Sequence, residues 1–231
     1  MANRTLVTGQ TEWPLSLTPR NITVTMDRPV FTGPKPLAGR EQVVSHSSGG
    51  WKISYEDIPI HVGSSGYNYD PASQVAPFKT VKQIMLLMAY DQSWIISPII
   101  GPLSIKNRYN LGTTNPTDCF LTRDHTRGDT TIYFANSTIA PLKNGDYFEL
   151  NGRLHIVLYT GIGTGNIVSS KNELTSQIWP PLRSNYSANQ LLEIADPRCT
   201  CYADVNSRAN SLTMQMGMNG SWNIDFTEAS W

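Results

Sequence analysis

Apolar and polar residues alternate along much of the chain in the manner of β-strands. Residues 22–26 alternate apolar side chains with threonines, and residues 51–55 alternate aromatic or branched apolar side chains with polar ones. Residues 131–134 form a third short run of β-branched and aromatic residues. Alternation with a period of two is typical of a strand that is buried on one face. The chain is therefore predicted to be mainly β.

Of the three Asn-Gly pairs in the chain, two stand between runs of this kind. Asn151-Gly152 separates the apolar residues of 148–150 from the alternating run 154–158. Asn219-Gly220 lies inside the alternating run 211–228. Asn-Gly supplies the positive φ angles that a two-residue hairpin turn requires. Both places are predicted to be β-hairpins, with the turn at the Asn-Gly pair.

Residues 73–90 have the spacing of a helix. Apolar residues recur every three or four positions between Phe78 and Met88, which gives one apolar stripe. Ser73 is placed to cap the N-terminus, and Pro77 is compatible only with the first turn. Methionine is an ordinary filler of core gaps, so the stripe is interpreted as a helix packed on the sheet.

The order of these elements predicts an inserted domain. Residues 28–50 are rich in proline and glycine, and are expected to be a long irregular arm that reaches a neighbouring subunit. The short strands and turns that follow predict a small barrel or sandwich. We expect an outer domain formed by residues 1–95 and 186–231, with a separable β-barrel at residues 96–185. The terminal hairpin should then pair with strands from the first third of the chain.

Composition narrows the classes of function. The 18 lysines and arginines balance the 18 aspartates and glutamates, and charged residues are only 16% of the chain. No basic cluster is present to bind phosphates, so nucleic-acid binding is not expected. The apolar stretch 84–103 is interrupted by Asp91 and Pro98, which argues against membrane insertion. The first residues lack a secretory pattern, and three cysteines cannot all pair, so a reducing compartment is expected.

Several motifs resemble binding sites but lack the necessary companions. The glycine-rich residues 161–165 have no following Lys-Ser or Lys-Thr, so no nucleotide loop is expected. Cys199 and Cys201 share one face of a strand, but the spacing of Cys119 and His125 brings neither to them as a zinc ligand. We therefore predict no metal and no cofactor.

The acidic and histidine residues do not form a recognisable catalytic set either. Asp124-His125 could orient a base, but no nucleophile elbow accompanies it. No spacing selects a carboxylate pair for glycoside hydrolysis. The residues considered for these roles are Asp57, Asp124, Asp129, Asp146, Glu149, His46, His61, His125 and His155. We predict no catalytic residues, and a protein that is not an enzyme.

An ordered set of short strings resembles the distal tail and minor tail proteins of long-tailed bacteriophages and gene transfer agents. The strongest are NGDYFEL at 144–150 with LHIV at 154–157, and IWPPLR at 178–183. ADP at 195–197 and IDFTEA at 224–229 follow in the same order. Upstream, LAGREQ at 37–42 leads to Trp51, as in the N-terminal arm and first strand of that family.

The resemblance implies a virion structural protein of the tail tip. It implies a belt β-sandwich related to the tail tube, with one packed helix and an inserted, OB-like β-barrel. The expected assembly is a homohexameric ring that joins the tail tube protein to the tail hub, baseplate or receptor-binding apparatus, and it would form in the host cytoplasm. The alternative is a carbohydrate-binding β module, in which exposed aromatic residues such as Tyr67, Tyr69 and Trp94 would stack on sugars.

Overall fold

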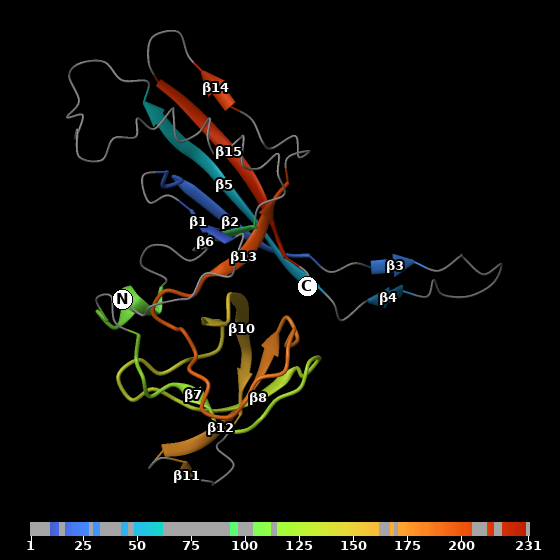
Figure 1. The fold of residues 1–231 in the computed structure, drawn as a ribbon, viewed down its shortest axis with the longest axis vertical. Helices are drawn as coiled ribbons and strands as arrows, with labels where there is room; N and C mark the ends of the chain where they lie inside the picture. Colours follow the sequence, from blue (N-terminus) through green and yellow to red (C-terminus); the bar gives the residue numbers. More distant parts are fainter. Residues whose placement is uncertain are drawn as a thin grey trace, which may run out of the picture.

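The computed structural model (Figure 1) is mainly β, as the sequence pattern predicts. It describes residues 10–13, 17–27, 30–32, 43–45, 49–61, 93–96, 104–111, 115–161, 167–168, 171–204, 212–214 and 219–229. Within these ranges the helical structure is the single turn α2 (Ile105–Arg108), whose N-terminus is capped by the Ser104 side chain. No described helix has the length and apolarity needed to cross a membrane. The predicted helix at residues 73–90 lies outside the described residues.

The first sheet joins the beginning and the end of the chain. Its strands run in the order β1-β6-β13-β15-β5-β2, with β14 pairing beside β13 on the same edge of β15. All pairs are antiparallel except the parallel pair of β1 and β6. The strands are β1 (Gln10–Glu12), β2 (Asn21–Asp27), β5 (Gly50–His61), β6 (Ser93–Ile96), β13 (Cys199–Ala203), β14 (Leu212–Met214) and β15 (Asn219–Glu228). Because β15 pairs with β5, the predicted pairing of the terminal strands with the first third is confirmed.

The second sheet is built entirely from the middle of the chain and lies below the first in Figure 1. It is antiparallel, in the order β7-β8-β12-β10-β9, with β11 pairing to β12. Its strands are β7 (Phe120–Leu121), β8 (Thr131–Ala135), β9 (Tyr147–Leu150), β10 (Arg153–Thr160), β11 (Ile167–Val168) and β12 (Lys171–Trp179). The whole sheet is inserted between β6 and β13, which are paired neighbours in the first sheet, with Ile96 opposite Cys199.

A third, two-stranded ribbon stands apart from both sheets. β3 (Val30–Thr32) pairs antiparallel with β4 (Val43–Ser45), and Figure 1 shows the ribbon projecting away from the rest of the molecule. We call residues 30–45 the arm. The prediction that residues 28–50 lack regular structure is wrong for these strands, because their β-branched and aromatic residues favour local pairing.

The two Asn-Gly pairs have different structures. Asn151 and Gly152 have φ angles of 50° and 76°, and they connect Leu150 to its partner Arg153, so this predicted turn is confirmed. The second hairpin is also present, since β14 pairs with β15. However, its predicted turn is wrong, because Asn219-Gly220 begins β15. Gly220 is paired on both edges, to β14 and to β5, and this long-range pairing determines the register instead of the local turn preference.

Two hydrophobic clusters lie beside the sheets. The first core comprises Leu17, Trp51, Ile53, Tyr55, Ile58, Trp94, Ile96, Leu154, Trp179, Cys199, Cys201, Trp222, Ile224 and Phe226. The second core comprises Ile105, Cys119, Leu121, Ile132, Phe134, Ala140, Leu142, Phe148, Leu150, Val157, Ile178, Leu182, Tyr186, Leu192 and Ile194.

The packing does not follow the expected boundary between residues 185 and 186. Leu154 and Trp179 come from the second sheet but pack in the first core. Tyr186, Leu192 and Ile194 lie beyond that boundary but pack in the second core. The chain therefore returns to the first sheet only near Cys199, and the division into separable domains stays a prediction.

Candidate functional site

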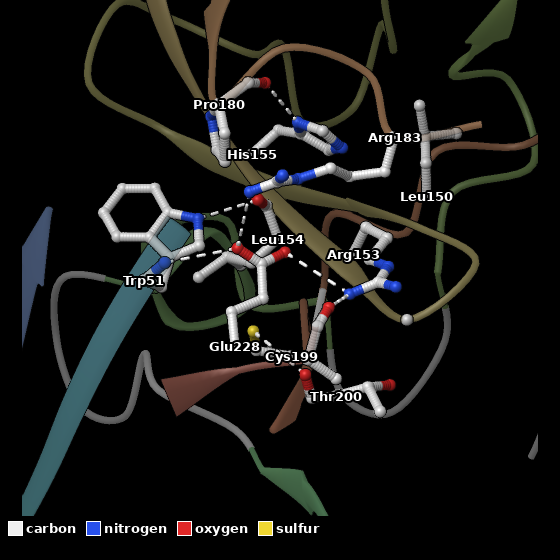
Figure 2. A network of polar contacts seen from close by, with 12 residues as sticks. Trp51, Leu150, Arg153, Leu154, His155, Pro180, Arg183, Cys199, Thr200 and Glu228 are labelled. Atoms are coloured by element: carbon white, nitrogen blue, oxygen red, sulfur yellow. Dashed lines mark hydrogen bonds and ion pairs between the residues drawn. The ribbon is translucent and has the colours of Figure 1, made fainter. Parts of the chain in front are cut away.

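The most distinctive polar site is buried where the two sheets meet (Figure 2). Four residues form it: Trp51 on β5, Arg153 on β10, Arg183 shortly after β12, and Glu228 on β15. We call these four residues the junction. Two of them belong to strands of the first sheet, and the two arginines belong to the inserted segment.

Glu228 reaches the junction because it continues a row of core-facing residues. Trp222, Ile224 and Phe226 are buried on one face of β15, and the period of two places Glu228 on the same face. Its side chain is only 2% exposed. The backbone N–H of Trp51 donates a hydrogen bond to its Oε2 at 3.2 Å. A carboxylate therefore occupies the last core-facing position of the strand.

Each arginine of the junction binds both Glu228 and the end of a first-sheet strand. Arg153 Nη1 lies 3.9 Å from Glu228 Oε1, and it also donates to the carbonyl oxygen of Ala229, which follows β15. Arg183 Nη2 lies 3.9 Å from Glu228 Oε2 and donates to the carbonyl oxygen of Gly49, which precedes β5. The two guanidinium groups thus fix strand ends of the first sheet to the inserted segment.

The electrostatics of the junction favour a structural role. Burial raises the pKa of Glu228 above its usual value, although Arg183, Arg153 and the Trp51 N–H act in the opposite direction. A buried ion pair is weak evidence for net stability, but removing one partner leaves an uncompensated charge and is strongly destabilising. The ion pairs of the junction therefore fix the position of the inserted segment relative to the first sheet.

His155 lies beside the junction in a fully buried position. Its Nδ1 is 2.9 Å from the carbonyl oxygen of Pro180, so this nitrogen carries the proton, and its ring stacks on Phe148. Its Nε2 has no hydrogen-bond partner among the described residues. The pKa of His155 is lowered to about 4, chiefly by burial and also by the nearby Arg183 and Arg153, while the hydrogen bond to the Pro180 carbonyl acts in the opposite direction. The imidazole is neutral near pH 7 and is closed to solvent.

Trp51 connects the two sheets through its side chain as well as its backbone. Its Nε1 donates a hydrogen bond of 2.8 Å to the carbonyl oxygen of Leu154 on β10. Its ring packs edge-on against Trp179, with 4.7 Å between ring centroids, and also contacts Tyr147. One tryptophan therefore bonds to both sheets at the point where they touch.

The two closely spaced cysteines, Cys199 and Cys201, lie in the first core, and Cys119 lies in the second. Cys199 and Cys201 are both 0% exposed on β13, and burial raises the pKa of the Cys199 thiol well above its usual value. Among the described residues, no three His, Cys, Asp or Glu side chains gather as a metal site would require. Here the two thiols act as small core side chains.

The structure does not form the Asp124-His125 pair considered as a catalytic base. The Asp124 carboxylate accepts the N–H of Ala188, 64 residues away, while His125 faces Asp129 at 3.5 Å. His125 Nε2 accepts the backbone N–H of Tyr133 at 3.1 Å, so the ring nitrogen that a base would use is occupied.

The other acidic candidates hold turns in the second sheet. Asp146 binds both terminal nitrogens of Arg108 at 3.0 and 2.7 Å, and accepts the N–H of Lys143. Glu149 accepts the N–H groups of Gly152 and Arg198, both at 2.9 Å. These contacts anchor connections of the chain and place no carboxylate beside a nucleophile. The glycine-rich residues 162–165 lie outside the described residues.

The expectation that Trp94 is an exposed aromatic residue is wrong. Its side chain is 0% exposed, because β6 lies between β1 and β13 and turns this ring into the first core, where Trp13 packs 5.9 Å away. Tyr67 and Tyr69 lie outside the described residues. The sugar-stacking alternative therefore loses the single described residue on which it rests.

The sequence reasoning does not single out Glu228, Arg153 or Arg183. A usable signal exists for Glu228, since an acidic residue in register with three core-facing residues has to find a buried partner. No local signal identifies the two arginines, which lie 75 and 45 residues earlier in the chain. Comparison of the chain with protein-family models and with curated proteins found no match.

Proposed function

We propose that the chain is a structural subunit of a bacteriophage tail tip, a distal tail or minor tail protein without catalytic activity. In this proposal it forms a homohexameric ring in the virion that contacts the tail tube protein on one side and hub or baseplate proteins on the other. The motifs from residue 37 to residue 229 support the family. The structural observation that supports it best is the insertion of one whole sheet between two paired strands of another.

The insertion fits a ring subunit because it separates two tasks. β6 and β13 remain paired in the first sheet, so the inserted segment leaves the strand order intact. The first sheet would form the belt, as one layer of a β-sandwich. The second sheet would close into the outward-facing, OB-like barrel. Both of these finer descriptions are part of the proposal.

The outer strand β2 offers an edge for assembly. It is the last described strand of the first sheet, and it pairs with β5 alone. Adjacent residues of a strand direct their backbone N–H and C=O groups to opposite edges. The N–H of Trp51 is directed toward β15, so the backbone groups of Lys52 are directed toward its partner Thr25 on β2. The backbone groups of Val24, next to Thr25, are therefore directed away from β5, to the outer edge of the sheet. Such an edge is a template for a strand from another chain. A neighbouring subunit in the ring would satisfy these groups.

The mass of the purified protein tests the proposal. We expect a closed ring at micromolar concentration by light scattering coupled to gel filtration. A variant in which Gly-Ser replaces residues 30–45 should keep its circular dichroism spectrum but lose the ring. The register makes this excision feasible, because Asp27 lies opposite Gly50 and the two ends of the arm are close. A wild-type protein that is monomeric at every concentration would contradict the proposal.

A further inference from the structure

The arm is bound at its base by residues of the junction. Gly49 is buried immediately before β5, and its carbonyl oxygen accepts a hydrogen bond from Arg183. The next residue, Gly50, is partly buried, and a Cβ placed there would lie 3.2 Å from Glu228 Oε2 and 3.5 Å from Arg183 Nη2. We call Gly49 and Gly50 the base of the arm.

Beyond its base, the arm has no described pairing to either sheet. β3 and β4 form a separate two-stranded sheet in which each pairs only with the other. Figure 1 shows this ribbon standing clear of both larger sheets. A two-stranded ribbon has little stability by itself, so its direction depends on how its ends are held.

The two arginines of the junction hold different strand ends. Both lie 3.9 Å from an oxygen of Glu228. Arg153 donates to Ala229 at the end of β15, and so connects the two sheets without touching the arm. Arg183 donates to Gly49, and so connects the inserted segment to the base of the arm. Both contacts of Arg183 are made by its Nη2, so this one nitrogen lies between the Gly49 carbonyl and the Glu228 carboxylate.

We propose that Arg183 is a positioning residue that couples the direction of the arm to the second sheet. A displacement of the second sheet would move the guanidinium, and with it Gly49 and the start of β5. The contacts that support this coupling are those of Arg183 with Gly49 and Glu228. Its use in ring formation rests on the proposed function.

Spin-label distances can measure the direction of the arm. The three native cysteines are free and buried, so labels attach selectively to introduced ones. Cysteine is introduced at Thr32 in the arm, at exposed Thr23 in the first sheet and at exposed Gln177 in the second sheet. The pair 32–177 reports the arm, and the pair 23–177 reports the sheets. Doubly labelled protein is diluted with unlabelled protein so that distances within one chain dominate.

Arg183→Met is the informative variant. We expect its 32–177 distance distribution to broaden while the 23–177 distribution stays as in the wild type, because Arg153 and Trp51 still join the sheets. Arg123→Met is the matched control, since it removes a bidentate arginine–glutamate pair within the second sheet, with Glu173. This control should change neither distribution. If Arg183→Met does not fold, Arg183→Lys should show a smaller broadening of the same pair.

Two results would overturn the proposal. One is an unchanged 32–177 distribution in a folded Arg183 variant. The other is equal broadening of both pairs, which would mean that Arg183 holds the sheets and not the arm. Ring mass is recorded separately on unlabelled protein. A wild-type monomer with the expected distance changes would overturn the proposed function and leave the coupling supported.

Discussion

The two cores of the molecule are stabilised in different ways. The first core is dominated by large rings, and Trp13 alone contacts Tyr55, Trp94, Trp222 and Phe226 with centroids 5.3 to 5.9 Å apart. The second core is mostly aliphatic, and carboxylates bound to arginines or backbone N–H groups hold the connections around it. Residues from both ends of the chain build the first core, whereas the second core uses only the middle.

This difference teaches where each half of the molecule is vulnerable. Aromatic side chains bury large areas, so truncating one in the first core removes many contacts at once. The second core has smaller side chains, so truncating one of them removes fewer contacts. The polar contacts around it hold the loops in position and contribute little to the buried apolar area. The first core also contains Leu154 and Trp179, which belong to strands of the second sheet. The first core therefore depends on the second sheet for part of its packing.

Excising the second sheet should have the largest effect. A variant that joins Ile96 to Cys199 through Asn-Gly preserves the β6–β13 register. We nevertheless expect it to unfold. It loses one buried leucine and one buried tryptophan, each worth about 2 to 5 kcal/mol, and it exposes to water the Trp51 ring that packs on Trp179. Their sum approaches the whole stability of a typical domain.

Circular dichroism and urea titration of the excised chain measure this effect. A cooperative unfolding transition close to that of the full chain would contradict the expected dependence. It would instead support the separable outer domain that the sequence order predicts.

Trp222→Ala tests the first core alone. The Trp222 side chain is 2% exposed and contacts Trp13, so its truncation should lower the free energy of unfolding by about 3 to 5 kcal/mol. Tyr159→Ala is the control, because this ring on β10 is 57% exposed, and it should change stability by about 0.5 kcal/mol or less. Equal effects of the two substitutions in urea titrations would remove the contrast between buried and exposed rings.

The stability of the folded chain should depend on pH through His155. Its pKa is lowered from 6.5 to about 4 by burial, so the folded state favours the neutral ring. The contribution of His155 is full above pH 6.5 and is lost as the pH falls toward 4, by about 3 kcal/mol in all. The measurement is the difference in unfolding free energy between wild type and His155→Gln at several pH values.

Glu228 acts in the opposite direction and has to be separated from this effect. Burial raises its pKa, so its contribution is present below pH 4.5 and is lost as the pH rises through the raised value. Since His155→Gln retains Glu228, the difference between the two proteins isolates the imidazole. A difference that stays constant from pH 7 to pH 4 would show that His155 is not buried in its neutral form.

The two Asn-Gly pairs provide the smallest expected effect. Gly152 has a φ of 76°, and a Cβ there would lie 2.7 Å from Thr200 Oγ1. Gly152→Ala should cost about 1 to 2 kcal/mol for the left-handed conformation, besides the displacement of Thr200. Gly220 lies in β15 and is not among the described residues with positive φ, so Gly220→Ala should be within about 1 kcal/mol of wild type. Thermal unfolding of the two variants gives the comparison.

The sequence predicts those parts of the fold that depend on residues close together along the chain. Alternation identifies β2, the first half of β5 and β15, and the Asn151-Gly152 turn follows from backbone preference alone. The Asn219-Gly220 turn fails because β5 continues opposite it to His61, and that extension is not encoded near the turn. Trp94 is a candidate for sugar stacking in the sequence, but its strand lies between two others and the ring is buried.

The junction could not be predicted for a similar reason. Arg153 and Glu228 are 75 residues apart, and their meeting depends on how two complete sheets dock. Neither residue lies in a motif that specifies the other. Glu228 is detectable as a polar residue in an apolar row, whereas the identity of its partners requires the docked structure.

Trp51 gives the molecule a built-in optical reporter. Its indole ring lies edge-on to Trp179 at a centroid distance of 4.7 Å, and the two rings belong to different sheets. Indole chromophores this close couple their electronic transitions, and the coupling falls away steeply when the rings separate. Trp13 also contacts Trp94 and Trp222 within the first core. The difference in near-ultraviolet dichroism between wild type and Trp179→Phe therefore isolates the pair that reports contact between the sheets.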